Sequence, residues 1–257
     1  MIPRSVAAMD NSGIVGDENS GTTCVPLIVT CNVEANVQVK CMNVCVAFSV
    51  GGRKSGGRSL FISFEEPEKQ LIRHAEGFGW NMNEFMDKDL IKFVTYSPET
   101  YNVEMQLDEV FRYLREYRPE RLVVDTIVAL GRVMIEDRYL RYLKSLTLYL
   151  KNQGITALFT ALAKSIMPII GTGISSSVDN IIALRHVEIE SSLRRSAVVV
   201  KARGSAHDNE IIEFEITPKG VVLKKKFLGM EQILGGTPRK SICEKTSTDG
   251  SRPSRVR

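Results

Sequence analysis

The sequence predicts an α/β protein with a mostly parallel sheet, flanked by helices and extended by antiparallel strands at its carboxyl-terminal end. Two patterns predict this fold class. From residue 58 onward, short apolar runs alternate with helical patterns of roughly ten to fifteen residues, which is typical of parallel strands joined by helices. After residue 177 the apolar runs are separated only by turns, which indicates hairpin-connected strands. We therefore expect one sheet with both kinds of strand pairing.

The first predicted elements lie between residue 59 and Pro119. Residues 59–64 and 91–95 are apolar runs too short for buried helices, which predicts two core strands. Residues 68–78 carry apolar side chains at helical spacing and stop at Gly79. A second helix is predicted before Pro119, because four apolar residues share one face of it: Leu107, Val110, Phe111 and Leu114.

Residues 121–126 (Arg-Leu-Val-Val-Asp-Thr) form the central predicted strand, in which three apolar residues run into an acid and a hydroxyl. A long helix follows, with leucines stacked along it, and Gly154 closes it. Residues 155–160 are the next strand. Beyond a Gly/Ser-rich loop, four further strands are expected at residues 180–190, 196–201, 211–217 and 221–225.

Composition divides the chain into three parts. Residues 1–57 form an irregular segment with neither helical nor strand periodicity, and its last seven residues read as a flexible linker. Residues 58–236 form the α/β core. Residues 237–257 hold six basic and two acidic residues, which accounts for the whole net charge of +4, and they are expected to be a disordered basic tail.

Charge and hydropathy exclude several classes of protein. The body without its tail is neutral, which does not indicate a nucleic-acid binder. No apolar run is long enough to span a membrane, and residues 1–20 lack the pattern of a signal peptide, so a cytoplasmic protein is expected. The spacing of the five cysteines fits free thiols in a reducing compartment better than a zinc site; they are Cys24, Cys31, Cys41, Cys45 and Cys243.

Acidic residues follow two of the predicted core strands. Asp125 ends the central strand, where open α/β sheets place their ligands. Glu65 and Glu66 follow the strand at residues 59–64, and a carboxylate there could position or deprotonate a water molecule for attack on a phosphate. The alternatives are an ordinary polar strand end at Asp125 and a solvated acidic turn before a helix at the two glutamates.

A basic loop and a hydroxyl-rich loop are the other candidates. Residues 201–207 (Lys-Ala-Arg-Gly-Ser-Ala-His) suit phosphate oxygens, although a basic hairpin turn is the alternative. Residues 171–177 carry several hydroxyls that could accept a phosphate or could simply belong to a flexible loop. His74 and His186 have no partners at ligand spacing, so they are interpreted as helix-surface and strand residues.

Residues 58–240 resemble the KaiC family of RecA-like P-loop ATPases, closest to the carboxyl-terminal domain of its two-domain members. Seven motifs, in order and at compatible spacing, carry the resemblance: Phe-Glu-Glu-Pro at 64–67, Gly-Phe-Gly-Trp at 77–80, Arg-Leu-Val-Val-Asp-Thr at 121–126, Asp-Asn-Ile-Ile-Ala-Leu at 179–184, Val-Glu-Ile at 187–189, Lys-Ala-Arg-Gly-Ser-Ala-His-Asp at 201–208 and Gly-Gly-Thr-Pro at 235–238. The resemblance implies ATP and magnesium as ligands and a homo-oligomeric ring, usually a hexamer, with ATP between protomers. Signalling proteins or other KaiC-like domains are further implied partners.

The resemblance also implies residue roles. Glu65 and Glu66 match the catalytic glutamates, and Glu65 with Asp125 would support magnesium. Four residues match the loop that reaches a neighbour's nucleotide: Lys201, Arg203, Ser205 and His207. Ser175 and Ser176 align with the adjacent serine and threonine that clock members autophosphorylate, which makes serine/threonine autokinase activity an expectation.

The family's phosphate loop, Gly-x-x-x-x-Gly-Lys-Ser/Thr, is missing upstream of Glu65. Residues 52–55 (Gly-Arg-Lys-Ser) come near it, but Arg53 stands where glycine is needed and no glycine lies five residues before it. Either the chain has lost this loop, or its first third is a shifted reading of the gene, which the abrupt change near Arg58 favours. The expected function is thus an ATP-binding ring ATPase, impaired in its own pocket; the alternative is a non-catalytic protomer that contributes only its trans-acting residues.

Overall fold

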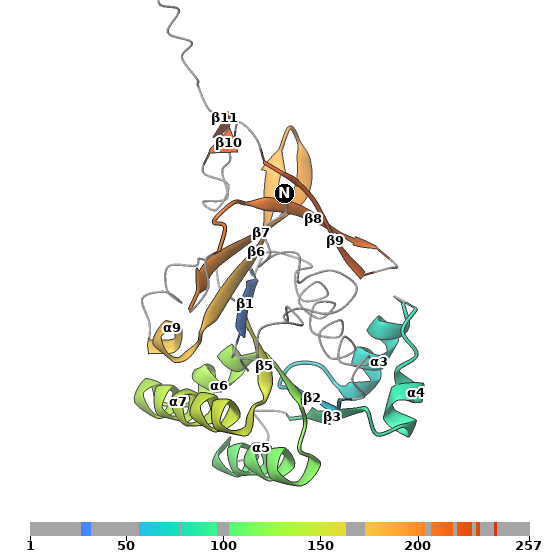
Figure 1. The fold of residues 1–257 in the computed structure, drawn as a ribbon, viewed down its shortest axis with the longest axis vertical. Helices are drawn as coiled ribbons and strands as arrows, with labels where there is room; N and C mark the ends of the chain where they lie inside the picture. Colours follow the sequence, from blue (N-terminus) through green and yellow to red (C-terminus); the bar gives the residue numbers. More distant parts are fainter. Residues whose placement is uncertain are drawn as a thin grey trace, which may run out of the picture.

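The computed structural model describes residues 27–31, 57–77, 79–96, 103–162, 173–203, 207–217, 220–227, 230–231 and 239–240, and Figure 1 shows their arrangement. Helices and strands alternate through the first half of the described chain: β1 (Leu27–Cys31), β2 (Ser59–Ser63), α3 (Glu68–Glu76), α4 (Met82–Asp87), β3 (Ile91–Thr95), α5 (Val103–Tyr117), β4 (Arg121–Asp125), α6 (Ile127–Val133), α7 (Glu136–Gln153) and β5 (Thr156–Leu162). The second half is mostly strands: α9 (Gly173–Ser177), β6 (Asn180–Ile189), β7 (Ser192–Ala202), β8 (Ile212–Thr217), β9 (Gly220–Lys226), β10 (Met230–Glu231) and β11 (Arg239–Lys240).

One large sheet confirms the predicted fold class. Its strand order is β3-β2-β4-β5-β1-β6-β7-β8-β9. Every pair from β3 to β6 is parallel, and every pair from β6 to β9 is antiparallel. The chain changes from helical crossovers to hairpins at β6, where the sequence predicted that change.

Helices cover both faces of the parallel part of the sheet. Side chains of α3 and α4 pack with Phe61 and Val123 on one face, and side chains of α5, α6 and α7 pack with Leu60 and Ile62 on the other. All five residues of β2 are therefore buried. Burial of both strand faces explains why this strand reads as a continuous apolar run rather than an alternating pattern.

Several helix boundaries depart from the expectations. The long helix predicted after the central strand is divided into α6 and α7, and a short helix, α4, lies before β3. Gly154 ends α7 with φ of 73°, which confirms the predicted stop, because glycine adopts this left-handed conformation without strain. The hydroxyl-rich segment expected to be a loop forms the single turn of α9.

Strand β1 lies inside the segment to which the sequence assigned no element. Its backbone pairs in parallel with β5 on one side and with β6 on the other. The central sheet therefore includes residues from the first 57. The strand was missed because the apolar run Leu27–Cys31 stands among residues without strand alternation.

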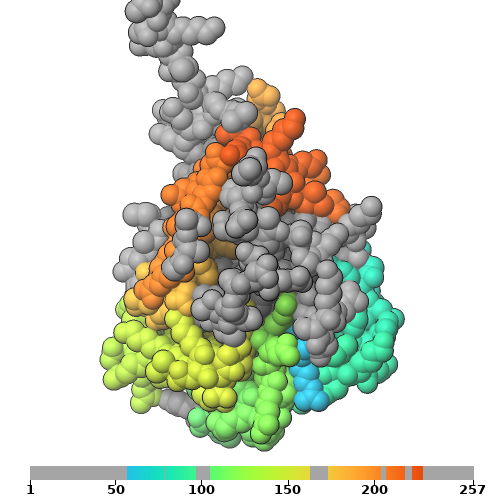
Figure 2. Space-filling model, viewed as in Figure 1, coloured from blue at the N-terminus to red at the C-terminus, as the bar shows by residue number. Residues whose placement is uncertain are grey.

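The two ends of the molecule have different architectures. Figure 2 shows the antiparallel strands β7 to β9, in orange, at one end, and helices α5 to α7, in green and yellow, at the other. Arg239 and Lys240, within the predicted basic tail, pair with β10 as β11. In the described part of the chain, none of the helices has the length and hydropathy of a membrane span.

Candidate functional site

The ends of β2 and β4 bring the predicted acidic residues to one edge of the sheet. Ser63 and Asp125 are the last residues of these neighbouring strands and lie opposite each other in the register. The backbone N–H of Phe64 then donates to the carbonyl oxygen of Asp125 at 2.7 Å. Glu65 and Glu66 consequently leave the sheet beside Asp125, at the carboxyl edge where α/β sheets bind ligands.

Ser63 shapes the turn that carries the two glutamates. Its fully buried hydroxyl accepts from the backbone N–H of Glu66 at 2.9 Å and of Glu65 at 3.4 Å. A serine hydroxyl that accepts from the two or three following residues forms a local turn in place of continued strand pairing. The turn therefore sets the backbone positions of both glutamates, a role that the apolar-run pattern did not reveal.

The two glutamate side chains approach helices on opposite faces of the sheet. Glu65 Oε1 lies 3.8 Å from a guanidinium nitrogen of Arg132 on α6. Glu66 Oε2 lies 3.3 Å from His74 Nδ1 on α3. The side chains are only 16% and 11% exposed, so both carboxylates are held in a largely desolvated place. The two side chains are therefore not solvated as the alternative of an acidic turn required, and His74, interpreted as a helix-surface residue, is only 25% exposed and contacts Glu66.

Asp125 is the most deeply placed of the three acids. Its carboxylate accepts a short hydrogen bond from the hydroxyl of Thr160 on β5. Burial raises the pKa of the Asp125 carboxyl to about 6, the Thr160 hydrogen bond works against this rise, and the charges of Glu65 and Glu66 add to it. Burial also raises the pKa of Glu66, opposed by His74 and reinforced by Glu65. Each ionised group therefore resists the ionisation of its neighbours.

Repelling, desolvated carboxylates suit a cation. A divalent ion beside Asp125 would relieve its repulsion with the neighbouring glutamates, and carboxylate oxygens are ligands that magnesium accepts. Within the described residues, no group of three or more His, Cys, Asp or Glu side chains is arranged as a complete metal site. Magnesium keeps several waters and is commonly bound with substrate phosphates, so one or two carboxylates suffice for the protein's share.

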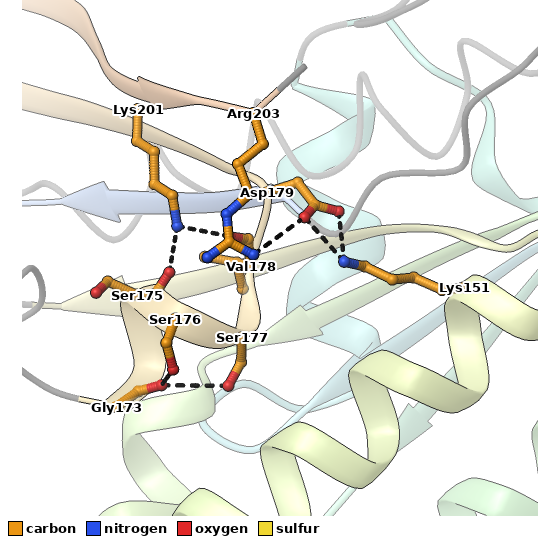
Figure 3. A network of polar contacts seen from close by, with 9 residues as sticks. All are labelled: Lys151, Gly173, Ser175, Ser176, Ser177, Val178, Asp179, Lys201 and Arg203. Carbon is orange, nitrogen blue, oxygen red and sulfur yellow. Dashed lines mark hydrogen bonds and ion pairs between the residues drawn. The ribbon is translucent and has the colours of Figure 1, made fainter.

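A second polar network gathers at the end of β7 (Figure 3). The Lys201 ammonium donates to the carbonyl oxygens of Ser175 and Val178, the latter at 2.8 Å. Arg203 lies 3.7 Å from the Asp179 carboxylate, and its backbone N–H donates to the Asp179 carbonyl at 2.9 Å. Two cations thus pair with the carboxylate of Asp179, because Lys151 on α7 also contacts it at 2.8 Å, while Lys201 is held nearby by backbone carbonyls.

This network has an excess of positive charge, which affects Lys201. Its pKa is lowered by burial first and then by the Arg203 charge, against the opposing effect of Asp179. Asp179 is 13% exposed and ties Arg203 to α7 through Lys151. Charge-assisted hydrogen bonds from cations of this kind also suit the oxygens of an anion such as a phosphate.

The other predicted residues lie around this network. Ser176 is exposed and donates from its hydroxyl to the Gly173 carbonyl at 2.7 Å. Ser175, in the preceding position of α9, provides one of the carbonyls that hold Lys201. His207, five residues after the end of β7 along the chain, is half-buried. Ser205 lies outside the described residues.

The acidic group and the cationic network are far apart in one protomer. Four strand steps separate β4 from β7, which is about 19 Å across a sheet. The registers place Val124, near the carboxyl end of β4, level with Ile181, near the amino end of β6. Ala202, the last residue of β7, lies opposite Asn180, the first residue of β6. The chain after Ala202 therefore emerges toward the amino ends of the parallel strands. The acids emerge at the carboxyl ends. The structure therefore does not bring the two groups together within one chain.

Comparison with known proteins assigns the chain to a family. A family model described as the KaiC ATPase matches residues 43–227. The chain belongs to the KaiC family of ATPases. The KaiC family resemblance seen in the motifs is thereby confirmed, and so is the expectation of a nucleotide-binding class of protein.

Individual KaiC proteins are similar to this chain over most of its length. It is 37% identical over 194 residues to the circadian clock protein KaiC3 of Synechocystis sp., which covers 74% of this chain and 38% of that protein. It is 32% identical to the circadian clock oscillator protein KaiC of Synechococcus elongatus over 74% of this chain and 37% of that protein. The KaiC of Thermostichus vulcanus is also 32% identical, over 76% of this chain and 38% of its own length. The chain thus spans less than two fifths of these KaiC proteins.

Proposed function

We propose that this KaiC-family chain is an ATP-binding protomer that completes nucleotide sites at the interfaces of a homo-oligomeric ring. One observation carries the proposal: the acids and the cations that suit one phosphoryl-transfer site emerge at different ends of the same sheet. Residues too far apart to meet within a protomer can meet across a boundary between two protomers. A contact between two different surfaces of the same protomer repeats head to tail, and it closes into a ring when the rotation between neighbouring protomers permits.

The acidic end would provide the reacting half of the site. Glu66 would orient or deprotonate the attacking water, as a carboxylate with a raised pKa can. Asp125 and Glu65 would hold magnesium through its water shell, and the ion would neutralise charge on the phosphate oxygens. Thr160 keeps the Asp125 carboxylate in one orientation by donating to it.

The cationic end would provide the receiving half. Lys201 and Arg203, with Ser205 and His207 in the following loop, would contact the phosphates of the nucleotide bound to the next protomer. Ser175 and Ser176 belong to the same end, because the carbonyl of Ser175 holds Lys201. A neighbour's nucleotide at this end would therefore lie near α9, which supports phosphorylation of these serines as a second activity.

A second candidate rests on the sequence that follows β1. In P-loop proteins the phosphate loop connects a strand to a helix. Residues 32–50, which follow β1, contain no glycine. Loss of that loop removes the backbone amides and the lysine that hold the phosphates. The second candidate is therefore a non-catalytic ring member that contributes only Lys201 and Arg203 to a neighbour.

Mixing two defective variants tests the proposal. In Glu66→Gln the acidic half is impaired and the cationic half is intact, and in Arg203→Ala the reverse holds. We expect each variant alone to hydrolyse ATP at roughly a hundredth of the parent rate or less. A mixture should recover a substantial part of the parent rate, because some interfaces then contain one intact half from each variant.

The controls separate the two candidates. A mixture of Glu66→Gln with the double variant Glu66→Gln/Arg203→Ala contains no intact reacting half and should recover nothing. If the unsubstituted protein is active but the first mixture recovers no ATP hydrolysis, sharing of the site across the interface is contradicted. The second candidate is supported instead by a different set of results. The unsubstituted protein would neither bind nor hydrolyse ATP. Its addition would stimulate a catalytically intact KaiC protein, and the Arg203→Ala variant would not.

A further inference from the structure

The contact between His74 and Glu66 has no place in the function proposed above. Glu66 Oε2 and His74 Nδ1 lie 3.3 Å apart. Both atoms are buried, and neither makes a hydrogen bond within the part of the chain that the structure describes. The 3.3 Å separation is an ion-pair distance rather than a well-aligned hydrogen bond. Buried polar atoms without partners are costly, so this mutual approach relieves a cost that each atom would otherwise carry alone.

Both partners are fixed by their surroundings. Leu71 and Ala75, which flank His74 on α3, are fully buried in the core. The Glu66 backbone is held by the Ser63 hydroxyl at 2.9 Å. His74 is 25% exposed and Glu66 is 11% exposed, so water competes weakly for the pair. The imidazole therefore approaches the carboxylate from a rigid helix.

We propose that His74 is a positioning residue that holds Glu66 Oε2 through its Nδ1–H, so that Oε1 is directed toward the water that Glu66 activates. An ionised carboxylate can only accept hydrogen bonds, so Nδ1 carries the hydrogen in this arrangement. The inference rests on the proposed function, since it assigns Glu66 the water-activating role. Hydrogen bonds of catalytic groups are often long before substrate binds, and the 3.3 Å distance is expected to shorten in the nucleotide complex.

Two substitutions separate positioning from packing. His74→Asn keeps an amide nitrogen on Cγ, where the imidazole has Nδ1, and so it keeps a donor to Glu66. His74→Leu introduces an apolar side chain of similar size and removes the donor. We expect His74→Leu to lower kcat roughly 10- to 100-fold with KM changed less than about twofold, because misplacement of a catalytic group affects the chemical step. His74→Asn should restore kcat to within about threefold of the parent.

Gln70→Leu is the matched control. Gln70 lies one helical turn before His74 on α3 and is exposed. An apolar side chain there should leave kcat unchanged. If His74→Leu leaves the kcat of an active parent unchanged, or if His74→Asn fails to restore it, the positioning role is wrong. An inactive parent overturns the proposed function, and the positioning role with it.

A second measurement needs no nucleotide. The chain has three histidines, His74, His186 and His207, so ¹⁵N-labelled histidine gives few signals in the nucleotide-free protein. We expect a protonated Nδ1 on His74, and a shift of its signal in Glu66→Gln with the other two unchanged. A deprotonated Nδ1, or a His74 signal that does not respond to Glu66→Gln, overturns the inference even when ATP hydrolysis is normal.

Discussion

Asp125 is placed where its own charge is unfavourable. Its side chain is buried, and the charges of Glu65 and Glu66 act on it. Its pKa of about 6 in the folded protein exceeds the value near 3.8 of an unperturbed aspartate. The folded state therefore binds the proton more tightly than the unfolded state, and stability falls as pH rises from about 4 to about 6. Above that range the full cost of the buried charge is present.

Asp125→Asn should therefore stabilise the nucleotide-free protein. The amide keeps an acceptor for the Thr160 hydroxyl and removes the charge. We expect a gain of roughly 1–3 kcal/mol in the free energy of unfolding at pH 7.5, shrinking toward pH 4. Urea unfolding at several pH values measures it, with the exposed Glu188→Gln as control. A destabilised Asp125→Asn at neutral pH would contradict the assigned electrostatics, and the gain should come with weaker magnesium binding.

Helix α9 is one turn long and depends on a side chain from outside it. Its five residues, Gly173–Ser177, are too few for a stable isolated helix. The Lys201 ammonium on β7 donates to two carbonyls at its carboxyl-terminal end, at Ser175 and Val178. A cation at this end satisfies carbonyls that lack helical partners and complements the helix dipole. The conformation of α9 is thus coupled to the position of Lys201.

Lys201→Met should loosen α9 in the nucleotide-free protein. Methionine keeps most of the side-chain volume but donates no hydrogen bond. We therefore expect the free energy of local opening of α9 to fall by about 1 kcal/mol, with faster amide exchange in residues 173–178. Hydrogen–deuterium exchange read by mass spectrometry measures this. Lys224→Met is the control, because the Lys224 ammonium pairs with exposed Glu215 at 2.7 Å and lies away from α9. Unchanged exchange in Lys201→Met would show that α9 is held by other contacts.

At the scale of the whole molecule, β1 joins the two halves of the sheet. The parallel strands β3, β2, β4 and β5 lie on one side of it, and strands β6 to β9 lie on the other. Val29 is opposite Thr160 of β5 and Ile182 of β6. Residues 58–236, predicted as the core, therefore depend on a strand that precedes them. A fragment that begins at residue 58 would leave β5 and β6 with unpaired edges.

Val29→Pro tests the place of β1 in the sheet. Proline has no N–H and cannot complete the ladder of an interior strand, so we expect a loss of about 3 kcal/mol or more in the free energy of unfolding. Glu136→Pro is the control: Glu136 is the first residue of α7, where proline is tolerated, and Ile135 before it is extended. Urea unfolding followed by circular dichroism compares them. Equal stability of both variants would mean that β1 does not bridge β5 and β6.

The fold class, the change from parallel to antiparallel pairing and the acids at the strand ends were all predictable from the amino-acid sequence. Periodicity, helix stops such as Gly154 and short apolar runs report burial along the local chain, and Asp125 and Glu65 follow such runs directly. The family followed from motifs at fixed spacing. Apart from the order and spacing of the family motifs, these signals lie within a few neighbouring residues.

Which residues act on one another became visible in the folded chain. Thr160 reaches Asp125 across 35 residues, Arg203 reaches Asp179 across a hairpin, and His74 approaches Glu66 from the far side of a turn. The place of β1 between β5 and β6, and the separation of acids from cations, also depend on strand order. These contacts could not be predicted because folding brings together residues whose spacing in the sequence carries no periodic signal. They become neighbours only when the strands pack in the order of the sheet.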